Sequence, residues 1–141
     1  MSTAAQSSQP LGNMRFRVAI AGTQGAGAVE VIFPEARLAA RGTAASKRPV
    51  RYGTLILRKG LTQSREWYEW WYAARRPAPA GRKRSGRDIT VTLMDAQGRD
   101  ACRWLFSDAH PQAYQLSSLN ALGNEPVLET LELSVGDFRM L

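Results

Sequence analysis

The sequence has 141 residues, the length of one ordinary domain, and its 44% hydrophobic and 22% charged residues exclude a disordered or collagen-like chain. Lysine and arginine outnumber the acids 19 to 12, so the net charge of +7 favours contact with polyanions or acidic protein surfaces. The single cysteine excludes an intramolecular disulfide. No apolar run approaches the roughly 20 residues that span a bilayer, and residues 1–10 lack signal-peptide features. We therefore expect a soluble single-domain protein made in the cytoplasm.

The reactive side chains argue against catalysis and against a bound metal. The one histidine, His110, and the one cysteine have no partners at the spacing of a zinc site. The glycines from Gly22 to Gly27 precede a strand pattern instead of a helix, which predicts a β-turn and not a phosphate loop. Asp108 lies two residues before His110, but no Gly-x-Ser-x-Gly motif accompanies them, and the segment ending at Pro111 predicts a polar turn. We expect no catalytic, metal-binding or cofactor-binding residue and no cofactor.

The first part of the chain predicts strands. Residues 1–13 are small and polar, so we expect a flexible segment ahead of one β domain over 14–141. Two alternating patterns predict strands that pair as an antiparallel hairpin, with apolar faces formed by Phe16, Val18 and Ile20 and by Val29, Val31 and Phe33.

Two segments link this pair to the next regular pattern. Residues 36–41 predict a weaker strand, and residues 42–50 have no periodicity and predict an extended loop. The loop lacks an apolar pattern with which to pack on its own domain. We therefore expect it to contact another subunit or ring, with four basic residues at or beside it in contact: Arg41, Lys47, Arg48 and Arg51.

A strand over residues 52–59, with Leu55 and Leu57 on one face, leads into the one predicted helix. Ser64 is placed to cap this helix, and Pro77 ends it. One apolar stripe follows the helical repeat, formed by Trp67, Trp70, Trp71 and Ala74. Such a stripe usually docks a helix onto a sheet or a neighbouring subunit, and we interpret the tryptophans as its packing face. A stacking platform for bases or sugars is the alternative.

The segment from Pro77 to Arg87 is rich in proline and glycine and predicts a basic loop. With the end of the helix it carries six cations and no acid, namely Arg75, Arg76, Arg82, Lys83, Arg84 and Arg87. A solvated loop and a contact with a polyanion or an acidic protein both fit this composition.

The remaining chain again predicts strands. One strand covers residues 89–94, and after a turn at 95–98 a return strand has Cys102, Trp104 and Phe106 on one face. A shorter strand is expected near Tyr114 and Leu116. A last strand has the alternating residues Leu131, Leu133 and Val135 on one face. Several short strands with one helix predict a mainly β fold, an antiparallel β-sandwich or barrel with one amphipathic helix.

The order of these motifs resembles the tail-tube proteins of contractile phages and contractile injection systems. The matching blocks are Pro10–Asn13 before the strand at 16–22, the segment Tyr52–Thr62 before the Trp-bearing helix, the hairpin at 89–98, the segment Trp104–Pro111, and Glu129–Leu133. The blocks cover residues 10 to 141. Two departures exist, because the family often has a tryptophan in place of His110 and a longer glycine-rich segment ahead of Tyr52.

The resemblance implies the tail-tube fold and a structural subunit that is not an enzyme. It implies hexameric rings stacked into an inner tube, which sheath contraction drives through a target envelope. The implied partners are other copies of the chain, the sheath protein, the baseplate or tube initiator, the tube terminator and cargo in the lumen, with no stable membrane anchor. The particle would assemble in the cytoplasm and could be released extracellularly.

The six cations near the helix end are expected on the outer wall of this tube, facing the sheath, because they would repel one another in a narrow lumen. Two other classes stay open. One is a basic β-barrel that binds single-stranded nucleic acid, favoured by the net charge and the tryptophans. The other is a small enzyme, which the inventory of side chains disfavours. The sequence does not distinguish a main tube protein from an initiator, or a phage from an injection particle.

Overall fold

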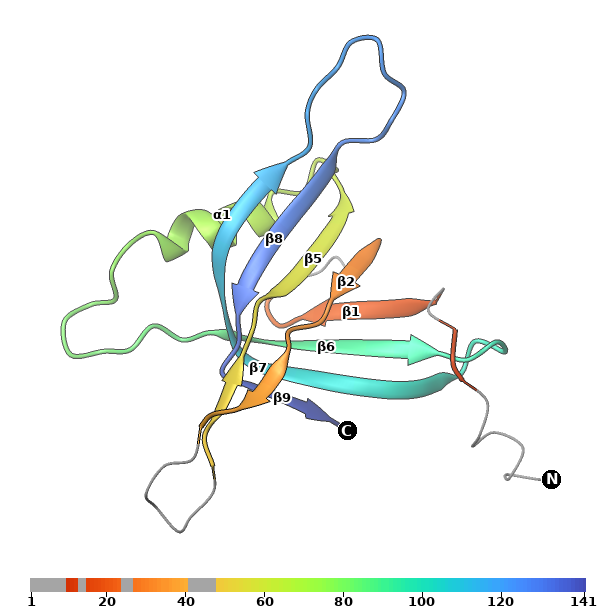
Figure 1. Cartoon of the computed structure of the whole chain (residues 1–141). Helices are drawn as coiled ribbons and strands as arrows, with labels where there is room; N and C mark the ends of the chain where they lie inside the picture. Colours follow the sequence, from red (N-terminus) through yellow and green to blue (C-terminus); the bar gives the residue numbers. More distant parts are fainter. Residues whose placement is uncertain (1–9, 13–14, 24–26, 41–47) are drawn as a thin grey trace.

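A computed structural model describes residues 10–12, 15–23, 27–40 and 48–141. Most of the segment expected to be flexible, residues 1–13, lies outside the described residues. The elements in chain order are β1 (Phe16–Ile20), β2 (Glu30–Ile32), β3 (Ala36–Leu38), β4 (Val50–Tyr52), β5 (Leu55–Gly60), α1 (Glu66–Ala74), β6 (Arg87–Met94), β7 (Asp100–Leu116), β8 (Leu128–Ser134) and β9 (Asp137–Met140). Figure 1 shows the helix beside a strongly bent sheet.

The main sheet is antiparallel and has the order β1-β6-β7-β8-β5-β2, with β9 paired to β7. Strand β7 is 17 residues long and belongs to two parts of this sheet. Its first half pairs with β6 and β9, and its second half pairs with β8. The expectation of a mainly β antiparallel fold with one helix is confirmed.

One buried core joins the two parts of the sheet and the helix. Its members are apolar side chains that alternate along their strands, together with two tryptophans of α1: Val18, Ile20, Leu55, Leu57, Ile89, Val91, Phe106, Ala109, Leu131, Leu133, Trp67 and Trp70. Leu55 lies opposite Leu133, and Leu57 lies opposite Leu131. Because successive strand residues face opposite sides of a sheet, residues two apart supply this shared face.

The predicted hairpin of β1 with β2 is wrong. Strand β1 pairs with β6 over its whole length, which sets Val18 beside Val91, and β2 pairs with β5. Val31 packs against the core, but Val29 is 61% exposed. Phe33 lies beyond the end of β2, with its ring 5.0 Å from that of Trp104. The pairing with β6 joins two buried apolar faces, which adjacency in the sequence does not reveal.

The predicted polar turn at Asp108–Pro111 is also wrong, because β7 continues through this segment to Leu116. Asp108 adopts a positive φ of 57°, a conformation that Asp tolerates better than most residues. Pro111 is accommodated next to a register shift between Pro111 and Ala113. The residues that favour turns therefore bend one long strand, and the segment near Tyr114 is the end of β7 and not a separate strand.

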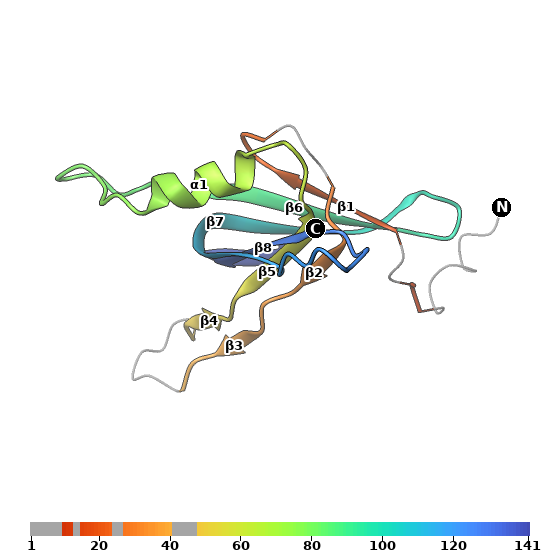
Figure 2. The ribbon, with the colours of Figure 1, turned by 90° about the horizontal axis from the view of Figure 1, so that it is seen from above.

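Strands β3 and β4 form a two-stranded sheet of their own, which we call the β3–β4 hairpin. It projects from the body of the molecule (Figure 2). The weaker strand expected over 36–41 is present as Ala36–Leu38. Most of the loop expected over 42–50 lies outside the described residues, and Val50 already belongs to β4.

Candidate assembly surfaces

The helix is anchored to the body by its tryptophans. Trp67 and Trp70 are 5% and 8% exposed, and Trp71 is partly buried against the core, with its ring stacked at 6.2 Å on Tyr114 of β7. Burying such large rings strongly favours docking of the helix. Because Trp67 and Trp70 are buried, their faces are not available to stack on bases or sugars.

The helix begins one residue later than the sequence indicates. Its N-cap residue is Arg65 instead of Ser64, and the Arg65 side chain makes no capping hydrogen bond. The Ser64 hydroxyl still accepts a hydrogen bond from the Glu66 N–H at 3.4 Å. Glu66 and Glu69 lie in the first turn, where the helix dipole favours negative charge.

The outer side of α1 presents aromatic rings beside cations, and we call it the helix surface. The Tyr68 ring lies 5.6 Å from both Tyr72 and Tyr114. The guanidinium groups of Arg65 and Arg75 lie over the Tyr68 and Tyr72 rings, at 5.7 and 3.8 Å. Tyr72 is 44% exposed, so a large aromatic side chain next to a cation is available to a partner.

The six cations around the helix end differ in their contacts. Arg84 donates a hydrogen bond to the Ala73 carbonyl at 3.2 Å, and Arg87 lies over the Trp70 ring at 4.7 Å, so both hold the loop against the helix. Arg75 lies over Tyr72, as described above. Like Arg75, the remaining three are exposed: Arg76, Arg82 and Lys83. The sequence analysis expected all six to face the sheath, because these contacts with the helix cannot be read from the sequence.

The β3–β4 hairpin has an apolar face and a basic face. Leu38 lies opposite Val50, and these side chains are 53% and 43% exposed. Arg37 lies opposite Arg51 on the other face, and Arg37 pairs with Glu35 at 3.0 Å. The hydrogen bond from this guanidinium, together with its charge, lowers the pKa of the Glu35 carboxyl.

Two further contacts bear on the predicted contact residues of this segment. Arg48 is exposed and donates a hydrogen bond to the Ala39 carbonyl at 3.0 Å, which links the two chains of the hairpin. Arg41 and Lys47 lie outside the described residues. At the base, the Tyr52 hydroxyl donates to Asp137 Oδ1 at 3.0 Å and joins the hairpin to the body. Burial, and then this hydrogen bond, raise the pKa of Tyr52.

A buried polar cluster that the sequence analysis missed joins three strands. Glu129 is 1% exposed, its Oε2 accepts a short hydrogen bond from the Tyr114 hydroxyl, and its Oε1 lies 2.7 Å from Lys59 Nζ. Among the described residues, this Oε1 has no hydrogen-bonding partner apart from that ammonium. Burial, and then the hydrogen bond to Glu129, raise the pKa of Tyr114. The Lys59 ammonium also lies 5.0 Å from the centre of the Trp67 ring.

The alternation of the strands contains a signal for this cluster. Lys59 follows Leu55 and Leu57 at a spacing of two, and Glu129 precedes Leu131 and Leu133 in the same way. In the sheet Lys59 lies opposite Glu129, so the pair continues the rows of opposed leucines. A charged residue in phase with a core face predicts a buried partner of opposite charge.

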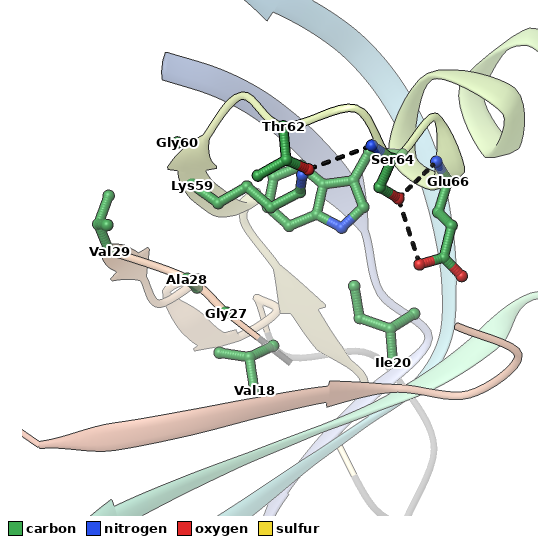
Figure 3. Close-up of a pocket in the computed structure, with 11 residues that line it drawn as sticks. Val18, Ile20, Gly27, Ala28, Val29, Lys59, Gly60, Thr62, Ser64 and Glu66 are labelled. Carbon is green, nitrogen blue, oxygen red and sulfur yellow. Dashed lines mark hydrogen bonds between the residues drawn. The ribbon is translucent and has the colours of Figure 1, made fainter. Parts of the chain in front are cut away.

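A cavity of about 380 Å³ opens between β1, the start of β2 and the start of α1 (Figure 3). Its wall is mainly apolar, with Val18 and Ile20 facing the segment that enters the helix. Lys59 reaches this wall, but its charge is compensated by Glu129. The cavity therefore offers apolar contact and little polar chemistry.

The described part of the chain contains no cluster of three or more His, Cys, Asp or Glu side chains that could hold a metal ion. His110 Nε2 lies 3.0 Å from Asp108 Oδ1, so the sequence neighbours do contact each other at the bend of β7. No helix in the described ranges has the length and apolar character that crossing a membrane requires.

Comparisons with known proteins identify relatives of this chain. The family described as T4-like virus tail tube protein gp19 matches residues 12–139. No curated protein sequence matches the chain. A chain from the sheath–tube complex of an extracellular contractile injection system, PVC, in its extended state superposes with a TM-score of 0.71 at 18% identity, over 100% of this chain and 98% of that one.

Two structures from the anti-feeding prophage have the same fold. A chain of its baseplate gives a TM-score of 0.64 at 20% identity, over 96% of this chain and 97% of that chain. A chain of its tube-terminating cap gives 0.69 at 18% identity, over 100% and 99%. At these identities, the likeness shows a shared fold.

Proposed function

We propose, from the membership of this chain in the family of T4-like virus tail tube proteins, that its copies form six-fold rings. These rings would stack into the inner tube of a contractile phage tail or injection system. As a member of this family, it is a structural subunit of a tail tube. We propose that it has no catalytic role and is assembled into the particle in the cytoplasm. The match over residues 12–139 is the observation that carries the proposal.

The edges of the sheet give this assembly a physical reason. Strands β1 and β2 stand at the two ends of the strand order, and β9 pairs with β7 alone. Unpaired backbone groups along such edges favour pairing with another chain. When one edge of a copy pairs with a different edge of the next copy, the contact is heterologous. If the rotation between successive copies returns to the first copy, the result is a closed ring. Copies of the chain can therefore protect one another's edges.

The partners follow from the particles that contain this fold. The solved relatives come from a sheath–tube complex, a baseplate and a tube-terminating cap. We propose the corresponding partners for this chain: a sheath protein around the tube, a baseplate or initiator at one end and a terminator at the other. The lumen would hold cargo. Sheath contraction would drive the tube through a target envelope.

Two surfaces are assigned to these contacts. The β3–β4 hairpin projects from the body and would reach a neighbouring ring, with Arg41, Lys47, Arg48 and Arg51 in contact. The helix surface and the exposed cations Arg76, Arg82 and Lys83 would face the sheath, because these side chains point away from the core that holds Trp67 and Trp70. Such exposed cations fit an acidic partner surface.

Negative-stain electron microscopy of the purified chain, alone and with sheath or baseplate proteins, tests the proposal. We expect six-fold rings in top view and tubes in side view. Sedimentation in parallel should show species much larger than one chain, in proportions that depend on concentration. A monomer at every concentration, without rings when sheath or baseplate is present, would contradict the proposal.

A further inference from the structure

The loop between β7 and β8, residues 117–127, holds two leucines away from the rest of the protein. Leu119 is 81% exposed and Leu122 is 95% exposed. The loop is built by defined hydrogen bonds: Asn120 Oδ1 accepts the Leu122 N–H at 3.0 Å, and the Gly123 N–H donates to the Asn120 carbonyl at 3.0 Å. We call this segment the leucine loop. Two large apolar side chains on one hydrogen-bonded turn, both almost fully exposed, make this loop a candidate contact surface.

The base of the leucine loop is fixed as well. The Ser117 N–H donates to the Leu128 carbonyl at 2.9 Å, and the Leu128 N–H donates to Ser117 Oγ at 2.9 Å. The two chains of the loop are thus tied where they leave the sheet. The turn is carried on a rigid support, which reduces the entropy lost when a partner binds.

The leucine loop and the β3–β4 hairpin project from opposite ends of the sheet. In the pairing of β5 with β8, Gly60 lies opposite Leu128, where the leucine loop begins, and Leu55 lies opposite Leu133. The hairpin continues from the Leu55 end of β5. Figure 1 shows the leucine loop at the top and the hairpin below. Copies stacked in the same orientation along the direction of β5 and β8 would bring the hairpin of one copy toward the leucine loop of the next.

The surfaces of these two projections are complementary. Leu38 and Val50 form an exposed apolar patch on the hairpin, and a two-stranded hairpin with both faces open gains stability from a cover. Residues 36–51 contain five cations and no acid, namely Arg37, Arg41, Lys47, Arg48 and Arg51. The leucine loop contains one acid, Glu125, and no cation.

We propose that Leu119 and Leu122 of one copy pack against the Leu38–Val50 patch of the next copy, stacked head to tail. The inference rests on the proposed function, because it names the receiving surface for the hairpin within a stack of rings. The two patches are different surfaces of the same chain. Their contact is heterologous, and repeated along an axis it produces an open stack instead of a closed dimer.

Cross-linking between introduced cysteines tests this contact directly. The background is Cys102→Ser, which removes the one native thiol, itself only partly exposed. Leu122→Cys and Val50→Cys are introduced together, and assembled tubes are treated with a short bis-maleimide. We expect covalent ladders of many copies from tubes and none from dispersed subunits. Each single-cysteine chain should stay monomeric on a denaturing gel.

The pair Leu122→Cys with Val29→Cys is the matched control, because Val29 lines the cavity beside β1, another apolar place for the leucines. Ladders from this pair, and not from the Val50 pair, would overturn the proposal and place the leucine loop in the cavity of a neighbour. Absence of ladders from both pairs in well-formed tubes would overturn it as well.

Substitution of the leucines gives a second, independent measurement. Leu119→Ser with Leu122→Ser should leave the circular dichroism and the rings unchanged, because both side chains are exposed in the subunit, and should abolish tubes longer than a few rings. Leu119→Met with Leu122→Met keeps apolar contacts and should restore tube length. Tubes of normal length from the serine variant would overturn the inference alone. A wild-type chain that forms neither rings nor tubes would instead overturn the proposed function.

Discussion

Gly86 fits so closely against Asp108 that a Cβ atom at Gly86 would lie 2.5 Å from Asp108 Oδ1 and 2.6 Å from its carbonyl carbon. The Gly86 N–H donates a hydrogen bond to the same Oδ1 at 3.0 Å. Asp108 has a positive φ where β7 bends between the two parts of the sheet. The glycine therefore allows the basic loop to close against this bend.

Gly86→Ala should destabilise the subunit by about 1–3 kcal/mol, because the new methyl group overlaps backbone atoms that cannot move freely. Urea unfolding monitored by tryptophan fluorescence measures the change. Gly60→Ala is the matched control, since a Cβ at Gly60 would meet no atom within 4 Å. We expect the control to differ from wild type by no more than about 1 kcal/mol. Equal stability of the two variants would contradict the assigned contact.

Tyr114→Phe should change how stability depends on pH. Burial and the hydrogen bond to Glu129 raise the pKa of Tyr114 in the folded protein, so the neutral phenol contributes stability below the pKa of an unfolded tyrosine, about 10. Above that pH the unfolded chain ionises first, and this contribution is progressively lost. The stability advantage of wild type over Tyr114→Phe should therefore shrink between about pH 9 and pH 11.

Urea unfolding at several pH values measures this difference. Tyr72→Phe is the control, because Tyr72 is 44% exposed. A constant difference between wild type and Tyr114→Phe across the range would show that the phenol does not titrate differently in the folded and unfolded states.

Glu129→Gln should be strongly destabilising, because Lys59 is 16% exposed and would lose the carboxylate that compensates its charge. Breaking a buried ion pair by removing one partner costs about 3–5 kcal/mol. The free energy of unfolding in urea measures the loss. Lys59→Met with Glu129→Gln removes both charges and should recover part of it. A double variant no more stable than Glu129→Gln would show that the unpaired ammonium is not the source of the cost.

Arg48→Glu with Arg51→Glu should block stacking while leaving the subunit folded, because both side chains are exposed on the projecting hairpin. Electron microscopy should show rings without long tubes. Arg103→Glu is a control at an exposed arginine of β7, outside the hairpin. Tubes of wild-type length from the hairpin variant would exclude these two arginines from the contact between rings.

Reversing the three exposed cations to Arg76→Glu, Arg82→Glu and Lys83→Glu should leave tubes intact and lower their sheath occupancy. Arg84 and Arg87 are kept because they contact the helix. Exposed ion pairs contribute about 0–1 kcal/mol each, so the effect should be collective and smaller at high salt. Sheath co-sedimentation at two salt concentrations measures it. Altered retention of cargo with normal sheath binding would place these residues in the lumen.

The sequence by itself determined the inner faces of several strands and the position of the helix. Leu55 with Leu57, and Leu131 with Leu133, alternate because successive strand residues face opposite sides, and this pattern needs no knowledge of the partner strand. The tryptophan stripe likewise indicated the helix from its own spacing. The ordered motifs also indicated the tail-tube family, which the match over residues 12–139 confirms.

Only the tertiary structure decided which elements meet. Strand β1 pairs with β6 and not with its neighbour β2, and Asp108 bends a continuous strand instead of ending one. Lys59 finds Glu129 across the sheet, although the two are far apart in the chain. These outcomes depend on the combined burial and pairing of distant segments, whereas periodicity reports only the geometry of the residues next to one another.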